Sequence, residues 1–225
     1  MKYKEEFYYL TQVIDSIYNK MINYTEVFVA ENPHSCNLKK TCIDKIFDIE
    51  KMEIDACFLK TILLFEKIVK KDKEIHVKKE VFELDIGSRI KNRKSIQLKL
   101  YRYHAKEGRG KYLINKCLND LLGYRFIIHS NNTLEDISKG IQFYVKNNYD
   151  LIKVKIQNAS KQGYKALHIY FKISNQCFPC ELQIWLSSDR VSNEKSHKKY
   201  KQEYLDWKEY ENVSSNYIWG DMDVL

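Results

Sequence analysis

The chain has 225 residues, of which 44% are hydrophobic and 30% charged, as is typical of a folded domain that buries its own core. It contains two prolines and seven glycines, which favours long regular elements over many short turns. No run of about eighteen apolar residues occurs, which excludes a membrane span. Residues 1–14 carry charges throughout, so we expect no signal peptide and a cytoplasmic protein.

The charge balance favours an anionic partner. Lys and Arg outnumber Asp and Glu by 38 to 30, a net charge of +8. Polyphosphates, nucleic acid and acidic proteins all fit this balance, although a lysine-rich surface can also be simply solvated. The six cysteines do not suggest a disulfide framework in a chain of this length. The single CxxC, Cys177 to Cys180, lacks the second ligand pair of a zinc site, so we expect reduced thiols and a turn.

The N-terminal part predicts helices. Apolar residues recur at helical spacing over 3–30 and 41–71, and Asn32 to Ser35 separates the two segments. From Val81 the pattern changes to a strand over 81–87. A helix over 96–103 opened by Ser95 and a short helix over 113–122 follow.

The remaining elements alternate between strands and helices. They are a strand over 123–128, a turn over 130–133, a helix over 134–145, strands over 150–156, 167–173 and 178–185, and a polar helix over 193–210. This order predicts the α+β class, with a mixed β-sheet flanked by helices. We divide the chain into a helical N-terminal extension (1–78), a catalytic domain (79–212) and a C-terminal tail (213–225).

Basic residues cluster where the first predicted strand gives way to a helix. Arg89, Lys91, Ser95, Lys99 and Arg102 lie there. Free backbone N–H groups at a helix start, together with Lys and Arg, make a site for phosphates, and Arg can also stack on a base. Taken alone, the same run is equally typical of a solvated surface loop.

Two acids could hold a metal ion. Asp120 precedes the predicted strand that begins with Gly123. Glu181 and Gln183 are two residues apart on a later predicted strand, so their side chains project from the same face of the sheet. A pair of carboxylates on neighbouring strands can bind Mg²⁺ and remove a proton from a hydroxyl. Alternatively, Asp120 is a surface acid and the later pair lies on the solvent face of a sheet.

An aromatic turn lies between the two acids. Gly163 permits a turn that presents Tyr164 as a flat surface for a base, and His168 follows on the next strand. A lone histidine on a strand more often has a structural role.

Taken in order, these segments resemble the RelA/SpoT synthetase domain. The succession is RxKxxxSxxxK (89–99), DLLGYR (120–125), GYxxLH (163–168), ELQI (181–184) and HKKYK (197–201), and it covers about residues 80–205. The resemblance implies a nucleotidyltransferase-like mixed sheet and an enzyme that transfers the pyrophosphate of ATP to a nucleotide 3′-hydroxyl.

The resemblance also implies a role for each matching residue. On the donor side, Arg89 would stack on adenine, Lys91, Ser95 and Lys99 would contact the phosphates, and Arg102 and Arg125 would add positive charge. Asp120 and Glu181 would hold Mg²⁺, with Glu181 as the base. On the acceptor side, Tyr164 would stack on the acceptor base, and His168, Gln183 and His197 would orient phosphates or the acceptor.

Departures from the family pattern lie on the acceptor side. Trp185-Leu186 replaces an Arg-Thr pair, Ala166 replaces a serine, and residues 159–162 lack the usual Pro-Lys. The segment after ELQI resembles the toxic branch of small alarmone synthetases. That branch modifies the 3′-CCA end of tRNA, and antitoxins neutralise its members. Three lysine pairs are candidate contacts to the tRNA backbone: Lys39-Lys40, Lys70-Lys71 and Lys78-Lys79.

Two other functions stay open. The first is an alarmone synthetase that uses GDP, GTP or an adenosine nucleotide as acceptor with the same donor chemistry. The second is an inactive nucleotide- or RNA-binding module, against which the presence of both Asp120 and Glu181 argues.

Overall fold

The computed structural model of the protein describes residues 2–75, 85–105 and 109–205. Its centre is a five-stranded sheet with the order β3-β4-β7-β6-β5. The strands are β3 (Asp85–Ile90), β4 (Leu122–Ile128), β5 (Val154–Asn158), β6 (Leu167–Phe171) and β7 (Cys180–Leu186). The β4–β7 pair is parallel and the other neighbouring pairs are antiparallel, so the expected mixed sheet is confirmed.

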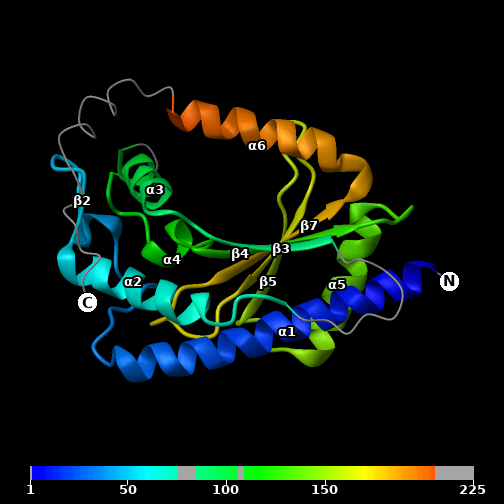
Figure 1. Cartoon of the computed structure of the whole chain (residues 1–225), viewed down its shortest axis with the longest axis horizontal. Coiled ribbons are helices and arrows are strands. Elements are labelled where there is room, and N and C mark those ends of the chain that lie inside the picture. The colour runs from blue at the N-terminus through cyan, green and yellow to red at the C-terminus, as the bar shows by residue number, and fades with distance from the viewer. Residues whose placement is uncertain (1, 76–84, 106–108, 206–225) are drawn as a thin grey trace.

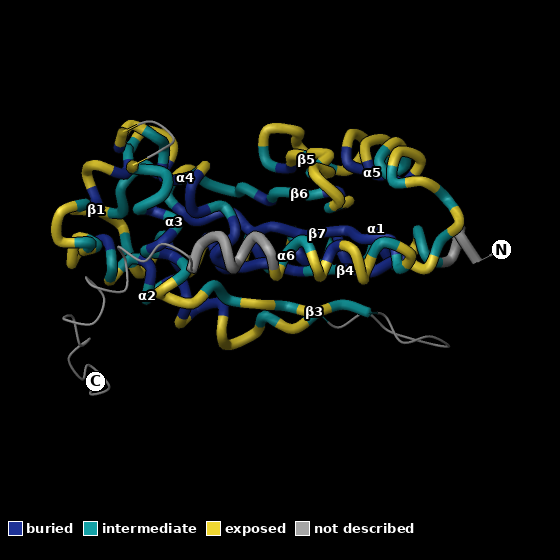
Figure 2. The backbone as a smooth tube through the Cα atoms, turned by 90° about the horizontal axis from the view of Figure 1, so that it is seen from above, coloured by how far each residue is buried: buried dark blue, intermediate teal, exposed yellow. Residues whose placement is uncertain are grey.

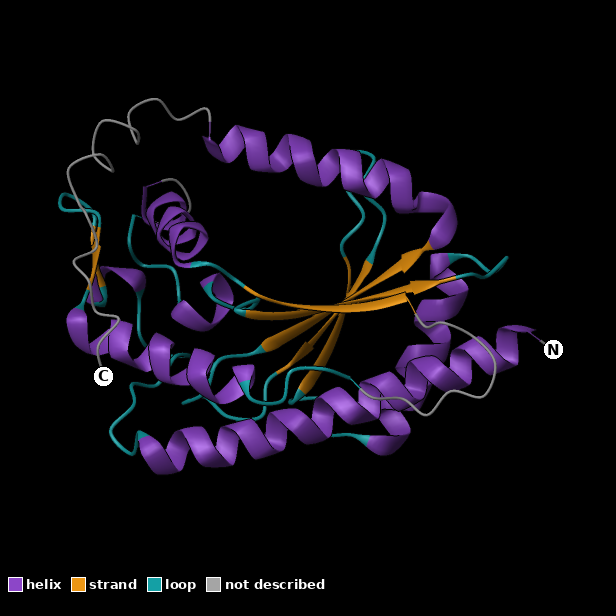
Figure 3. Ribbon diagram, viewed as in Figure 1, coloured by secondary structure: helices purple, strands orange, loops and turns teal. Residues whose placement is uncertain are grey.

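Helices flank the sheet on both sides (Figures 1 and 3). They are α1 (Lys2–Glu31), α2 (Ala56–Lys70), α3 (Arg93–Ala105), α4 (Ile114–Cys117), α5 (Leu134–Asn148) and α6 (Arg190–Leu205). Short turns η1 (Ile43–Lys45) and η2 (Ser187–Asp189) and a small hairpin, β1 (Phe47–Asp48) with β2 (Glu53–Ile54), complete the described elements. Within these residues, every helix is too short or too polar to cross a membrane.

The two faces of the sheet differ in chemistry. One face is apolar: residues such as Phe126, Ile169 and Leu182 belong to one buried core that also includes residues of α1, α2 and α5. The opposite face carries polar side chains and lies toward α6 (Figure 1). The central strands β4 and β7 are almost entirely buried (Figure 2). The polar face is therefore where chemistry can occur.

Strand pairing arranges the polar face in rows across the sheet. One row reads Arg89, Gly123, Glu181, Tyr170 and Lys155, and the next reads Gly87, Arg125, Gln183, His168 and Gln157. A third row begins with Asp85, Ile127 and Trp185. Residues from five separate segments of the chain thus become immediate neighbours.

The helix expected over 41–71 is wrong in its first half. Residues 43–54 form η1 and the β1–β2 hairpin, and the helix begins only at Ala56. Met52 adopts a left-handed backbone (φ 56°), which closes the hairpin turn, and the Asp55 carboxylate accepts a hydrogen bond from the Phe58 backbone N–H at 2.9 Å as a helix cap. The apolar spacing came from Ile43, Ile46 and Phe47, which reach the same core from irregular backbone.

Other elements are confirmed with shifted ends. The helix over 113–122 shrinks to α4, the strand over 150–156 begins only at Val154 because residues 151–153 form a turn, and the tail helix begins earlier, at Arg190. The strand expected over 81–87 is β3, and its first predicted residues, 81–84, lie outside the described residues. The proposed domain boundary at 78 also lies there and stays a prediction. A bend at 175–177 precedes β7, and the buried Cys177 and Cys180 are free thiols.

Candidate active site

Asp120 forms the first part of the site. It lies two residues before β4 and is 8% exposed, so it is not a surface acid. Its Oδ2 lies 2.7 Å from Nζ of Lys91, which follows β3, and its Oδ1 lies 2.9 Å from Nζ of Lys99 on α3. The Arg89 guanidinium lies 4.0 Å away, with its side chain packed over Gly123. Three cations from two elements therefore converge on one buried carboxylate.

The electrostatics keep this cluster charged. Burial acts to raise the pKa of Asp120, but the ammonium groups of Lys99 and Lys91 hold it well below its ordinary value. Burial lowers the pKa of Lys91, and the charge of Asp120 opposes that shift. The carboxylate is thus ionised at neutral pH, beside two lysines that can also bind phosphate oxygens.

Glu181 on β7 forms the second part. It is 5% exposed, as is Gln183, so the alternative of a solvent-facing pair is wrong. Glu181 Oε1 lies 3.0 Å from His168 Nδ1, and Oε2 accepts a hydrogen bond from Gln183 Nε2 at 2.8 Å. Burial acts to raise the pKa of Glu181, but His168 lowers it overall, while the charge of Asp120 opposes the lowering. Glu181 is therefore held in place as a carboxylate by His168 and Gln183.

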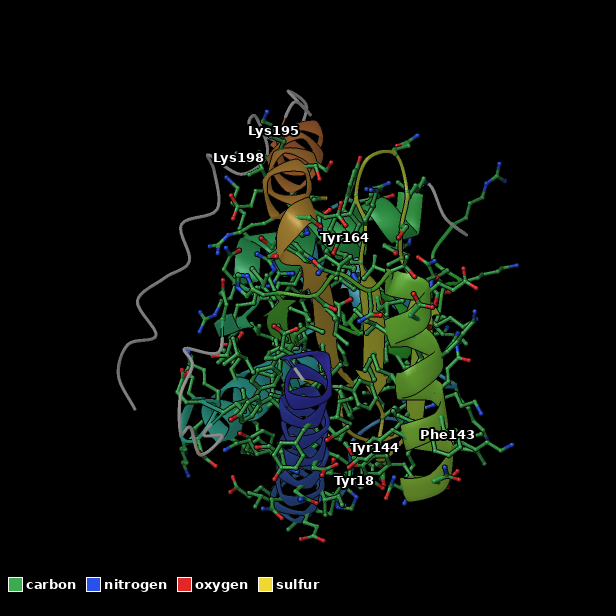
Figure 4. The ribbon with its side chains drawn as sticks, turned by 90° about the vertical axis from the view of Figure 1, so that its right-hand side faces the viewer. Tyr18, Phe143, Tyr144, Tyr164, Lys195 and Lys198 are labelled. Carbon is green, nitrogen blue, oxygen red and sulfur yellow. The ribbon has the colours of Figure 1, made fainter. Side chains whose placement is uncertain are left out.

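Tyr164 forms the third part. Left-handed backbone at Gln162 (φ 50°) and Gly163 (φ 84°) makes the turn that carries it, as expected from the glycine. The Tyr164 hydroxyl lies 3.0 Å from His168 Nε2 and accepts a hydrogen bond from Trp185 Nε1 at 3.1 Å. Burial raises the pKa of Tyr164 to about 12, so the phenol stays neutral. In Figure 4, Tyr164 lies on the α6 side of the sheet.

A pocket of about 450 Å³ opens between α6 and strands β3, β4 and β7. Arg89, Arg125, Trp185 and His197 are among its lining residues. The Arg125 guanidinium lies 3.7 Å from the ring centroid of Trp185, and burial together with the charge of Arg89 lowers the pKa of Arg125. In the described part of the chain, Arg125 has no ion pair with a carboxylate. The pocket therefore offers flat cationic and aromatic surfaces to an anionic ring compound.

The structure brings most of the predicted residues together, in two groups. One group is Arg89, Lys91, Lys99 and Asp120, and the other is Tyr164, His168, Glu181 and Gln183. Arg125 joins them, because it donates to Gln183 Oε1 at 3.2 Å. The His197 ring on α6 lies 5.1 Å from that of Tyr164.

Ser95 and Arg102 lie on α3 at helical spacing from Lys99, so the three share one helix face. Neither of the two lines the pocket. Their expected contacts with ATP stay predictions.

Three residues of the site were not expected from the sequence. The Tyr170 hydroxyl lies 3.2 Å from His168 Nδ1, and burial together with the charge of Glu181 raises its pKa well above the ordinary value. Trp185 was noticed only as a departure from the family pattern. Asn193 on α6 is fully buried, and its side chain bonds both the backbone N–H and C=O of Lys165 at 2.8 Å. Alternation along β6 could have identified Tyr170, but no local pattern indicates Asn193.

A magnesium ion shared with a substrate would take its protein ligands from Asp120 and Glu181. Carboxylate oxygen is the preferred protein ligand of Mg²⁺, which commonly uses one or two carboxylates plus substrate phosphates. Among the described residues, no group of three or more His, Cys, Asp or Glu could hold a metal by itself. Asp120 and Glu181 would supply carboxylate oxygens to such an ion, and substrate phosphates would complete its coordination.

Comparisons with known proteins identify the family of this chain. The model for the region found in RelA / SpoT proteins matches residues 88–204, slightly more than half of the chain. Small alarmone synthetase 1 from Bacillus subtilis is 16% identical with a TM-score of 0.34, and the match covers 53% of this chain and 63% of that one. Small alarmone synthetase 2 from the same organism is 18% identical with a TM-score of 0.35, and the match covers 67% and 77%. No curated protein matches.

Proposed function

The chain belongs to the RelA/SpoT family of ATP-dependent pyrophosphokinases, and from this premise we propose that it modifies the 3′-CCA end of tRNA. The observation that carries the donor chemistry is the cluster of Asp120 with Lys91 and Lys99, beside the pocket lined by Arg89 and Arg125. Phosphoryl-type transfer depends mainly on positioning and on positive charge around the phosphates. This cluster supplies both.

The reaction would use the two groups of residues in turn. The 3′-hydroxyl oxygen attacks the β-phosphorus of ATP, the bond from that phosphorus to the bridging oxygen of AMP breaks, and AMP leaves. Glu181 takes the hydroxyl proton, and His168 and Gln183 hold its carboxylate in place at 3.0 and 2.8 Å. Magnesium, held by Asp120 and Glu181, would neutralise charge on the phosphates.

Two observations support a tRNA acceptor. The chain has a net charge of +8, and phosphate contacts dominate affinity for nucleic acid. The departures from the family pattern, Ala166 and Trp185, lie together in a small apolar cluster against Tyr164, the residue expected to stack on the acceptor base. The residues that depart from the family pattern thus lie together on the expected acceptor side, while the expected donor-side residues match the pattern.

Blocking the 3′-end of tRNA would stop aminoacylation. We therefore propose that the protein inhibits translation and growth as a toxin, and that a protein antitoxin neutralises it. Induction of the wild-type chain should arrest growth, whereas a Glu181→Gln variant expressed at the same level should not.

The acceptor is tested with ATP labelled at the γ-phosphate. Wild-type protein and Mg²⁺ are incubated with deacylated tRNA, with tRNA lacking its terminal adenosine, or with GDP, GTP or AMP. Label on intact tRNA alone supports the proposal. Label on a free nucleotide alone would show an alarmone synthetase instead, and bound ATP without any transfer would show a binding module.

A further inference from the structure

Lys155 ends the row of residues that contains Glu181, at the edge of the sheet. It lies on β5, paired with Tyr170, which is paired in turn with Glu181. Neighbouring strands are about 4.8 Å apart, so Lys155 stands about 10 Å from the base, on the side away from the ATP-binding residues. Val154 and Ile156 point into the apolar core, so the exposed side chain of Lys155 projects from the polar face.

Further lysines continue from Lys155 along this side of the molecule. The backbone N–H of Lys172 donates to Lys153 C=O at 2.8 Å, which extends the β5–β6 pairing and places both residues beyond Tyr170 on the same face. The loop after α1 joins them, because Leu38 N–H donates to Asn175 C=O at 2.8 Å. Burial, together with the nearby charge of Lys39, lowers the pKa of Lys172.

The loop also connects this surface to α4. Asn115 N–H donates to Leu38 C=O at 3.0 Å, which sets the exposed Lys116 beside the exposed Lys39 and Lys40. We call the whole surface the lysine track. Its members are Lys39, Lys40, Lys116, Lys153, Lys155 and Lys172.

The charge of the lysine track is not neutralised locally. In the described part of the chain, none of its six members forms an ion pair with a carboxylate, whereas Lys91 and Lys99 both bind Asp120. The acid nearest in sequence, Asp150, accepts a hydrogen bond from the backbone N–H of Ile152. Lysines gathered from several segments without acids generate a field that attracts a polyanion.

We propose that the lysine track binds the phosphate backbone of the RNA acceptor and delivers its 3′-end to Glu181, an inference that rests on the proposed function. The track draws on four separate segments of the chain, an extent that suits a polymer of phosphates rather than a mononucleotide. The members of the track are lysines, whose ammonium groups are point charges that suit phosphate contacts rather than base reading. An acidic protein could also be attracted, but the track leads directly to the base, where a 3′-hydroxyl must arrive.

The test compares two variants with the same change in charge. The first is Lys39→Gln, Lys155→Gln and Lys172→Gln on the lysine track. The matched control is Lys60→Gln, Lys67→Gln and Lys146→Gln, exposed lysines of α2 and α5, the helices that cover the apolar face. Binding of fluorescent deacylated tRNA is measured by anisotropy over a series of salt concentrations, without ATP.

The track variant should bind tRNA about tenfold or more weakly at low salt. Its slope of log K against log salt should be smaller by about 2, because each lost phosphate contact removes roughly 0.7 to 0.9. The control should stay within about twofold of the wild type. Three results would overturn the proposal. Equal losses of affinity in both variants would show a general effect of net charge, and unchanged tRNA binding by the track variant would leave an acidic protein as the partner of this surface. No tRNA binding by the wild type would exclude RNA as the partner.

Transfer is measured separately, so that the two proposals can fail independently. If the wild type binds tRNA through the lysine track but labels only GDP, the proposed tRNA acceptor is wrong while the binding surface holds. If the wild type labels tRNA and the track variant does so at the wild-type KM, the lysine track is wrong while the proposed function stands.

Discussion

The indole Nε1 of Trp185 donates a hydrogen bond to the hydroxyl oxygen of Tyr164 at 3.1 Å. The Glu181 carboxylate can only accept, so His168 carries a proton on Nδ1, which lies 3.0 Å from Glu181 Oε1. In the neutral imidazole, Nε2 then accepts a hydrogen bond from the Tyr164 hydroxyl at 3.0 Å. A directional chain of hydrogen bonds thus runs from a residue outside the family pattern to the expected base.

Trp185→Phe removes the donor and keeps an aromatic ring beside Arg125. A net hydrogen bond contributes about 1 kcal/mol, so we expect kcat/KM for the acceptor to fall about fivefold to tenfold. The KM for ATP should not change. Steady-state kinetics with each substrate varied in turn measure both values, and unaltered acceptor kinetics would contradict the role of Trp185.

Glu181→Gln keeps the shape of the side chain and removes the base. We expect transfer to fall by about a hundredfold or more, with the protein still folded by circular dichroism. Gln157→Ala is the matched control, because this exposed residue lies on the same polar face, in the row of Gln183. The control should turn over like the wild type. Glu181→Gln within tenfold of wild-type turnover would show that another group takes the proton.

Asp120 should make folding sensitive to acid. Its pKa in the folded protein lies below the unfolded value of about 3.9, so its ion pairs stabilise the fold fully above that value. This stabilisation is lost progressively as the pH falls through the unfolded value toward the folded one. Asp120→Asn leaves Lys91 and Lys99 without a countercharge and should lower the free energy of unfolding by about 3 kcal/mol at pH 7.

The difference between wild type and Asp120→Asn should narrow as the pH falls from about 5 to about 3. Urea unfolding at each pH measures it. Parallel curves for the two proteins over this range would mean that the ion pairs of Asp120 do not stabilise the fold.

Asn193→Ala should disturb the Tyr164 turn from a distance. The substitution removes both hydrogen bonds between the Asn193 side chain and the backbone of Lys165, and each contributes about 1 kcal/mol to stability. We expect a raised KM for the acceptor and an unchanged KM for ATP. Ser192→Ala, on the exposed side of the same helix, is the control and should change neither. Equal increases in both KM values would point to general loosening instead.

Much of the fold could be read from local patterns. Alternation identified β7 and helical spacing identified α1 and α5, because burial of one face leaves a period in the sequence. The same reasoning failed at 41–55, where Ile43, Ile46 and Phe47 are buried at helical spacing without a helix. An apolar period reports burial, and the conformation of Met52 and the cap at Asp55 decided the backbone there.

The sequence by itself determined the family and the α+β class and supplied the candidate site residues, since these depend on motifs of a few residues in a fixed order. Only the tertiary structure decided which residues are in contact. It brings Asp120 to two lysines, Trp185 to the Tyr164 hydroxyl and Asn193 to the backbone of Lys165, and it places the members of the lysine track on one surface. Those contacts join residues far apart along the chain. They depend on strand order and register, which the packing of the whole core selects and no local segment encodes.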